Sequence, residues 1–231
     1  MLPEQLLGWS ASLKQTEIYA VPTAAGTQIE CSRVNITSLK IDDLSLIAGE
    51  MNRCSNSGGV GLIGINAFSG HVWKFQTDHS TASGIIKQEA QLPSRLQAFS
   101  LRRDAAGFIY IPVTVGRDDV YALFDTGTST EGLISPKFLE KYKAHLKLLR
   151  RKILATSAGT TAQHDVYELD SLTIAQNYTM TKLQLDLVDD PALWSWYEQS
   201  GAQIILGMGT IGALTWHLDL IKNKWAVDSG R

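Results

Sequence analysis

The sequence predicts an all-β protein built from one complete and one incomplete copy of the same unit. Short stretches of alternating apolar and polar residues, separated by turns with Gly or Asn, fill most of residues 107–227. This pattern is typical of β-strands joined by hairpins. The chain also repeats itself, because residues 1–41 align without a gap on residues 134–174, and the alignment resumes with Trp73 on Trp216. A repeat of this length indicates two similar structural copies.

The repeat divides the chain into three segments. We expect an incomplete N-terminal lobe at residues 1–78, a linker at 79–106 and a complete C-terminal lobe at 107–231, with the two copies related by an approximate two-fold axis. A chain of 231 residues is long enough for two lobes of roughly 100 residues each.

Composition excludes several functions. Apolar residues make up 44% of the chain, which is enough for a packed core. The net charge of -2 leaves no basic surplus for nucleic acid or a membrane surface. We find no apolar run of the roughly 18 residues that a membrane span requires, and residues 1–7 lack the features of a secretion signal. Compartment is not predicted.

The two cysteines, Cys31 and Cys54, carry no metal-binding spacing. We expect them to be free thiols, although a disulfide between them remains open.

The complete copy reads as a series of short elements. The helix expected after Ser135 begins with a proline and has apolar residues at helical spacing, with basic residues gathered near its end. The expected elements are strands at 108–116 and 121–124, a helix at 136–149, a hairpin at 153–167, strands at 169–174, 183–188 and 204–207, a short helix at 208–214 and a hairpin at 216–227 turned at Lys222-Asn223.

One motif carries chemistry. Asp125-Thr126-Gly127 follows the apolar strand 121–124 directly, and the apolar strand Ile205-Leu206-Gly207 follows some 80 residues later. Together with the hairpin between them, this order of elements resembles the retropepsin-like aspartic protease family. The resemblance covers residues 107–228, and it extends to 1–78 through the repeat. It implies closed β-barrel lobes and the activity of an aspartic endopeptidase.

The resemblance also assigns roles to residues. It makes Asp125 catalytic, while Thr126, Gly127 and Thr128 support the catalytic loop: the Thr126 hydroxyl bonds across the two-fold axis, and that of Thr128 supports the carboxylate. The strand that ends at Gly207 would hold this loop from behind. Glycine-bearing hairpin tips in both copies correspond to substrate-binding flaps, formed by Ala158, Gly159, Thr160, Ala25 and Gly26.

The chemistry of such a site follows from two neighbouring carboxylates that share one proton. The ionised one takes a proton from water, and the protonated one polarises the peptide carbonyl. The mechanism uses no metal and no cofactor. The expected partner is a peptide or protein substrate, and no nucleic acid.

One chain supplies one such aspartate, so three hypotheses remain. A second aspartate belongs to the first copy and lies about nine residues before Met1, by the offset of the repeat. Alternatively, Asp125 from two chains pairs in a homodimer. In the third hypothesis the protein is a non-catalytic peptide-binding or interaction module. The repeat favours the first, because the half-copy already resembles the natural partner of the complete lobe.

The connector Trp194-Ser195-Trp196-Tyr197 in the second copy has no counterpart in the first. Its aromatic residues would either line a substrate groove or pack between lobes, and the sequence leaves both alternatives open. The histidines at 71, 164 and 217 are expected to be ordinary strand residues.

Overall fold

The structure is a computed structural model that describes residues 15–22, 28–36, 39–41, 44–46, 49–54, 68–78, 83–105, 107–155, 161–175, 178–198 and 200–228. These residues are mostly β-strand, which confirms the all-β prediction. The chain divides into two compact units. The first comprises Met1–Ser69 with Ile153–Gln163, and the second comprises Gly70–Lys152 with His164–Arg231.

The first unit contains two small antiparallel sheets. One has the order β1 (Gln15–Pro22), β2 (Gln28–Ile36) and β5 (Gly49–Cys54), and the other pairs β3 (Leu39–Ile41) with β4 (Leu44–Leu46). Cys31 lies opposite Cys54 in the pairing of β2 with β5, and Cys31 is buried and disulfide-bonded. The expectation of free thiols is therefore wrong, because the register brings the chain's only other cysteine directly across from Cys31.

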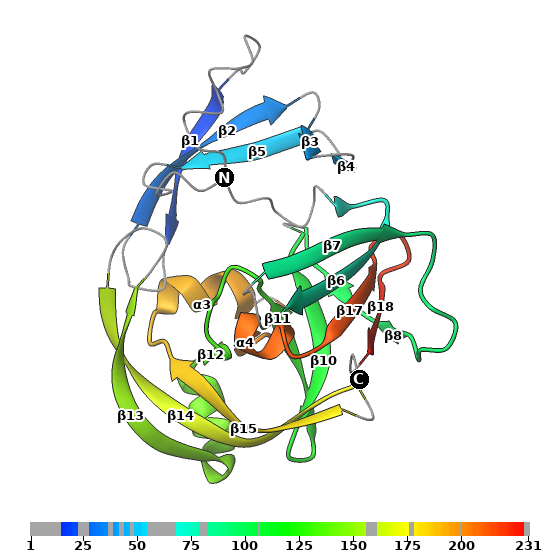
Figure 1. The fold of residues 1–231 in the computed structure, drawn as a ribbon. Coiled ribbons are helices and arrows are strands. Elements are labelled where there is room, and N and C mark those ends of the chain that lie inside the picture. Colours follow the sequence, from blue (N-terminus) through cyan, green and yellow to red (C-terminus); the bar gives the residue numbers. More distant parts are fainter. Residues whose placement is uncertain are drawn as a thin grey trace. The chain divides into compact units, whose positions relative to one another are not determined.

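The second unit is built around an eight-stranded sheet. Figure 1 shows its long strands β13, β14 and β15 side by side. The sheet follows the order β13 (Leu146–Ala155), β14 (Thr161–Ile174), β15 (Tyr178–Leu187), β12 (Gly132–Ile134), β16 (Ile204–Leu206), β11 (Asp118–Phe124), β10 (Ile109–Val115) and β9 (Arg102–Arg103).

An additional pairing closes part of this sheet on itself. Val113 and Thr114 of β10 pair with Ile174 and Thr173 of β14, although the two strands are not neighbours in the sheet order. Side chains on the inner face are fully buried, among them those of Tyr110 and Leu172. The closed sheet satisfies backbone groups that an open edge would leave unpaired.

A five-stranded sheet in the same unit combines segments from both copies of the repeat. Its order is β7 (Ser83–Glu89), β6 (Val72–Asp78), β17 (Thr215–Asp219), β18 (Lys224–Asp228) and β8 (Phe99–Ser100). Trp73, Trp216 and Trp225 are buried in it. The segment 79–106, expected as a linker, thus contributes β7, β8 and β9 to the two sheets of this unit.

The helix after Ser135 is shorter than predicted. Ser135 caps it, since its Oγ accepts a hydrogen bond from Phe138 N at 3.0 Å, and the helix α2 runs over Pro136–Tyr142. A single 3-10 turn, η2 (Lys143–His145), follows, and Leu146 already begins β13. The helical spacing up to Leu149 was misleading, because pairing with β14 satisfies the backbone of these residues in an extended form.

Most of the remaining elements follow the prediction, but the strand β12 was not predicted and β15 begins at Tyr178 rather than at residue 183. β14 is one continuous strand rather than two, and the connector before β16 contains a helix, α3 (Pro191–Glu198), that the sequence analysis did not predict. The short helix α4 (Met208–Ile211) and the hairpin of β17 with β18 confirm the expected elements. In that hairpin, Asn223 adopts a left-handed backbone with φ of 52°.

Candidate active site

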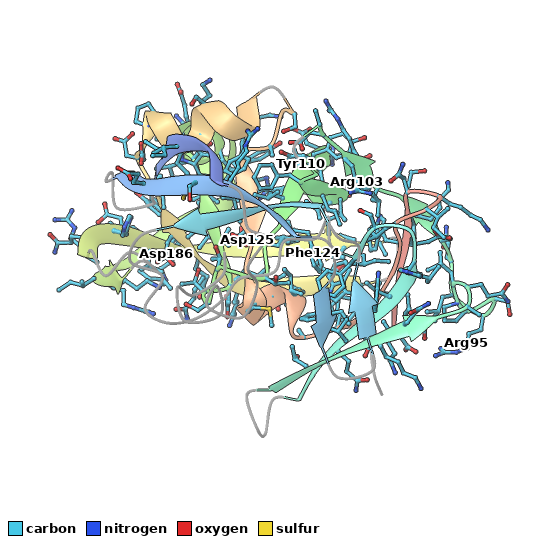
Figure 2. The ribbon with its side chains drawn as sticks, turned by 90° about the horizontal axis from the view of Figure 1, so that it is seen from above. Arg95, Arg103, Tyr110, Phe124, Asp125 and Asp186 are labelled. Carbon is cyan, nitrogen blue, oxygen red and sulfur yellow. The ribbon has the colours of Figure 1, made fainter. Side chains whose placement is uncertain are left out.

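Asp125 follows the last residue of β11, at the point where three strands meet. β11 pairs with β16 in parallel, with Phe124 opposite Leu206, and β16 pairs on its other side with β12. Asp125 N donates a hydrogen bond to Leu206 O at 3.0 Å. Figure 2 shows Phe124 and Asp125 beside each other, with Asp186 to one side. The position of Asp125 is therefore set by the central strands of the sheet.

Two donors of its own loop hold the Asp125 carboxylate. Gly127 N donates to Oδ1 at 2.8 Å, and Thr128 Oγ1 donates to Oδ2 at 2.7 Å. Each carboxylate oxygen thus has one protein donor and keeps a further lone pair for another partner. Asp125 is half-buried, so that partner can be a water molecule or a ligand. The arrangement favours a fixed carboxylate plane with an accessible edge.

Two glycines are required by this loop. A Cβ at Gly127 would lie 3.1 Å from Oδ1 of Asp125, so a side chain there would crowd the carboxylate. A Cβ at Gly207 would lie 2.2 Å from Thr130 O and 2.8 Å from Thr128 O, closer than real carbon atoms approach. Gly207 therefore packs directly against the back of the loop, as the resemblance implied.

Backbone hydrogen bonds fasten the loop to the segment that begins at Gly207. Met208 N donates to Thr128 O at 2.7 Å, and Gly209 N donates to Thr130 O at 3.0 Å. Because α4 begins at Met208, these bonds tie the loop to the first turn of that helix.

Glu131 is a residue of this site that the sequence analysis missed. Its backbone oxygen accepts from Gly207 N at 3.0 Å and from Thr210 Oγ1 at 2.7 Å, while its carboxylate accepts from Gln184 N on β15. Glu131 thereby links the Asp125 loop to β15 and α4. The only sequence clue is an acidic residue directly before the apolar strand β12, which a single sequence does not distinguish from a surface residue.

Thr126 lies in the loop itself, and two aromatic residues pack next to it. Thr126 is exposed in the second unit, so its expected hydrogen bond to a second loop stays a prediction. Phe124 packs edge-on against Trp216 with ring centroids 4.9 Å apart, and Trp216 Nε1 donates to Ile211 O at 2.7 Å. The ring contact and the hydrogen bond of Trp216 thus connect β11, β17 and α4 next to the Asp125 loop.

The connector helix α3 packs its aromatic residues inside the second unit. Trp194 is buried and donates through Nε1 to Val188 O at 2.7 Å, and Tyr197 is also buried. Burial is the main cause that raises the pKa of Tyr197, and the negative charge of Asp125 adds to it. Burial likewise raises the pKa of Tyr110 to about 12, and Asp104, which accepts from its hydroxyl at 2.8 Å, adds to it.

Two further sets of residues were named from the sequence, the flap residues and the histidines of the strands. The flap residues Ala158, Gly159, Thr160, Ala25 and Gly26 lie outside the described residues. Among the histidines, His164 Nδ1 lies 2.9 Å from Leu187 O, and His217 Nδ1 lies 2.7 Å from Glu89 Oε2. Both histidines therefore bond within the sheets that carry them.

In the part of the chain that the structure describes, no three His, Cys, Asp or Glu side chains gather in a way that could hold a metal ion. Nor is any helix there long and apolar enough to cross a membrane.

The segment that contains Asp125 is similar to known proteins. Residues 111–210 match the family model described as aspartyl protease. This segment holds β11, the Asp125 loop and the strand β16, which is followed by Gly207. The segment around Asp125 is therefore similar to the aspartyl protease family. No curated protein matches the chain.

Several solved structures are distantly similar. A retropepsin-like aspartic protease from Rickettsia conorii has 15% identity and a TM-score of 0.40, and the match covers 60% of this chain and 96% of that one. Basic 7S globulin from soybean has 10% identity and a TM-score of 0.47, over 96% and 75% of the chains. Conglutin gamma, a 7S globulin from lupine seeds, has 10% identity and a TM-score of 0.45, over 92% and 72%.

Proposed function

We propose that the protein is an aspartic endopeptidase in which Asp125 supplies one of two catalytic carboxylates. The observation that carries the proposal is the way in which hydrogen bonds hold the Asp125 carboxylate. Gly127 N and Thr128 Oγ1 each hold one carboxylate oxygen from the protein side, and the half-buried group keeps lone pairs for a further partner. A carboxylate held in this way is suited to bind and deprotonate a water molecule.

The reaction requires a second carboxylate close enough to share a proton with Asp125. The ionised carboxylate takes a proton from water as the water oxygen adds to the carbonyl carbon of the peptide. The protonated carboxylate gives its proton to the carbonyl oxygen. In the second step the carboxylate that took a proton from water gives it to the nitrogen of the scissile bond, and the carbon–nitrogen bond breaks. One hydroxyl of the tetrahedral intermediate returns its proton to the other carboxylate, and a carboxylic acid and an amine leave. Substrates are peptides or proteins.

We further propose that the second carboxylate belongs to the first copy of the repeat. The register of β6 with β17 supports this: Trp73 pairs with Leu218, and Phe75 pairs with Trp216. The sequence alignment equates Trp73 with Trp216 and Phe75 with Leu218. If each residue is replaced by its equivalent in the other copy, the pair Trp73–Leu218 becomes the pair Trp216–Phe75. A two-fold axis between β6 and β17 would have this effect. On this basis the equivalent of Asp125 lies about nine residues upstream of Met1.

The test compares two proteins, the 231-residue chain and a longer product that includes the in-frame upstream sequence. We expect the longer protein to cleave peptides as a monomer, and the shorter chain to be inactive or very weak. Activity of the shorter chain that rises with the square of its concentration would instead identify a homodimer. If neither protein cleaves peptides but both bind them, the molecule is a binding module and the proposal is wrong.

Thr128 offers a graded test of the same site. Thr128→Val removes the hydroxyl that donates to Asp125 Oδ2 at 2.7 Å and keeps the shape of the side chain. We expect kcat/KM of the active form to fall tenfold to a hundredfold, since a hydrogen bond to a charged group contributes about 1.5–3 kcal/mol. Thr128→Ser keeps the hydroxyl and should retain most activity. Equal losses in both variants would assign the effect to packing of the methyl group.

A further inference from the structure

Tyr197 is held rigidly in the second unit. Its side chain is 9% exposed, and its ring meets the ring of Phe108 edge-on at 5.4 Å and that of Trp194 at 6.3 Å. Its backbone oxygen accepts from Ser200 N at 3.0 Å and from Ser200 Oγ at 2.8 Å. Contacts on the ring and at the end of α3 therefore fix the direction of the phenol.

The pairing of β10 with β11 brings Tyr197 near Asp125. In that ladder Tyr110 lies opposite Leu123, and both strands continue by one further residue, to Ile109 and Phe124. Phe108 and Asp125 each lie two residues beyond the last pair of this ladder, at the same end of the hairpin. Since the Tyr197 ring contacts Phe108, it lies at the same end of the hairpin as the Asp125 carboxylate. The effect of the Asp125 charge on the pKa of Tyr197 agrees with this position.

The Tyr197 hydroxyl differs from those of two other tyrosines of this unit. Tyr110 donates to Asp104 at 2.8 Å and Tyr142 donates to Asp118 at 3.2 Å, whereas Tyr197 has no acceptor for its hydroxyl among the described residues. The Tyr197 hydroxyl is not fully buried, so a water molecule or a ligand can accept its hydrogen bond. The raised pKa keeps this phenol protonated, so it can donate a hydrogen bond but cannot act as a base.

We propose that the Tyr197 hydroxyl donates a hydrogen bond to the carbonyl oxygen of the peptide bound at Asp125. This inference rests on the proposed function and adds a substrate-contacting residue to it. The carbonyl oxygen is the expected acceptor, because it gains negative charge as water adds to the peptide. A hydrogen bond to this oxygen is then stronger than in the bound substrate. Tyr197 comes from a connector that is longer in the second copy than in the first, so this contact would make the two halves of the site unequal.

The test uses the active form of the protein and the variant Tyr197→Phe, which keeps the ring and removes the hydroxyl. We expect kcat/KM to fall about tenfold to a hundredfold, mainly through kcat, because the hydrogen bond strengthens in the transition state. A peptide with a hydroxyethylene group in place of the scissile amide should lose affinity by a similar factor. Tyr142→Phe, which also removes a buried tyrosine's hydroxyl, is the matched control and should keep full activity.

The outcomes separate the two proposals. If the wild-type protein is active and Tyr197→Phe is equally active, the inference about Tyr197 is overturned and the proposed function stands. If Tyr197→Phe and Tyr142→Phe lose activity to the same extent, the loss reflects packing, which also overturns it. If no form of the protein cleaves peptides, the proposed function fails and the inference fails with it. Urea unfolding of both variants verifies that they are folded.

Discussion

Replacement of Asp125 by Asn should abolish peptide cleavage and leave the fold intact. Asn has nearly the shape of Asp, but it neither shares a proton with a second carboxylate nor accepts one from water. Its oxygen can still accept from Gly127 N, and its amide can donate to the Thr128 hydroxyl, so the loop should persist. We expect kcat of the active form to fall by about 10³-fold or more.

Asp119→Asn is the control for this experiment. Asp119 lies on the same strand, is exposed, and accepts a hydrogen bond from Thr114 Oγ1 at 2.7 Å in the turn region of the β10–β11 hairpin. It should retain wild-type turnover. An Asp125→Asn protein that cleaves peptides at the wild-type rate would contradict the mechanism, whereas one that has unfolded by circular dichroism would show that the carboxylate is needed for structure.

Replacement of Gly207 by Ala should produce the largest loss of stability among single-methyl changes in the described part of the second unit. The added Cβ would lie 2.2 Å from Thr130 O and 2.8 Å from Thr128 O, and backbone atoms on both sides leave it no room. Overpacking commonly costs about 1–3 kcal/mol, and a clash with backbone is at the upper end or beyond. We therefore expect the free energy of unfolding to fall by at least about 3 kcal/mol.

Gly201→Ala separates the steric clash from the loss of a glycine. A Cβ at Gly201 meets nothing within 4 Å, but the residue has φ of +76° and so resists any side chain. We expect this control to lose only about 1–2 kcal/mol, measured by urea unfolding with tryptophan fluorescence. If the free energy of unfolding falls by the same amount in both variants, the tight packing of Gly207 behind the Asp125 loop does not account for the loss of stability.

Several features of the site were predictable because they depend on neighbours along the chain. The aspartate after an apolar strand, the glycine two residues later and the hydroxyl of Thr128 lie within four residues of one another, and their hydrogen bonds close within that span. Gly207 was predictable as a residue behind the loop only through the family resemblance. Glu131 was not, because its partners lie on β15, at Gly207 and at Thr210, far away in sequence.

The errors in the predicted elements have a common cause. The helical spacing of residues 136–149 is real, yet the chain becomes a strand at Leu146, where β14 offers a complete set of backbone partners. The disulfide-bonded state of Cys31 likewise depends on the register of β2 with β5. Pairing between separate strands decides both, and the periodicity within one segment does not reveal it.

The sequence by itself determined the all-β class, the internal repeat, the hairpin turns and the aspartate at the centre of the site, because alternation, turn residues and a short motif are properties of contiguous residues. Only the tertiary structure decided where α2 ends, that α3 exists, which strand of the first copy pairs with β17, and which residues surround Asp125 from behind. These features depend on backbone hydrogen bonds and packing between separate segments of the chain, and such contacts form only in the folded chain.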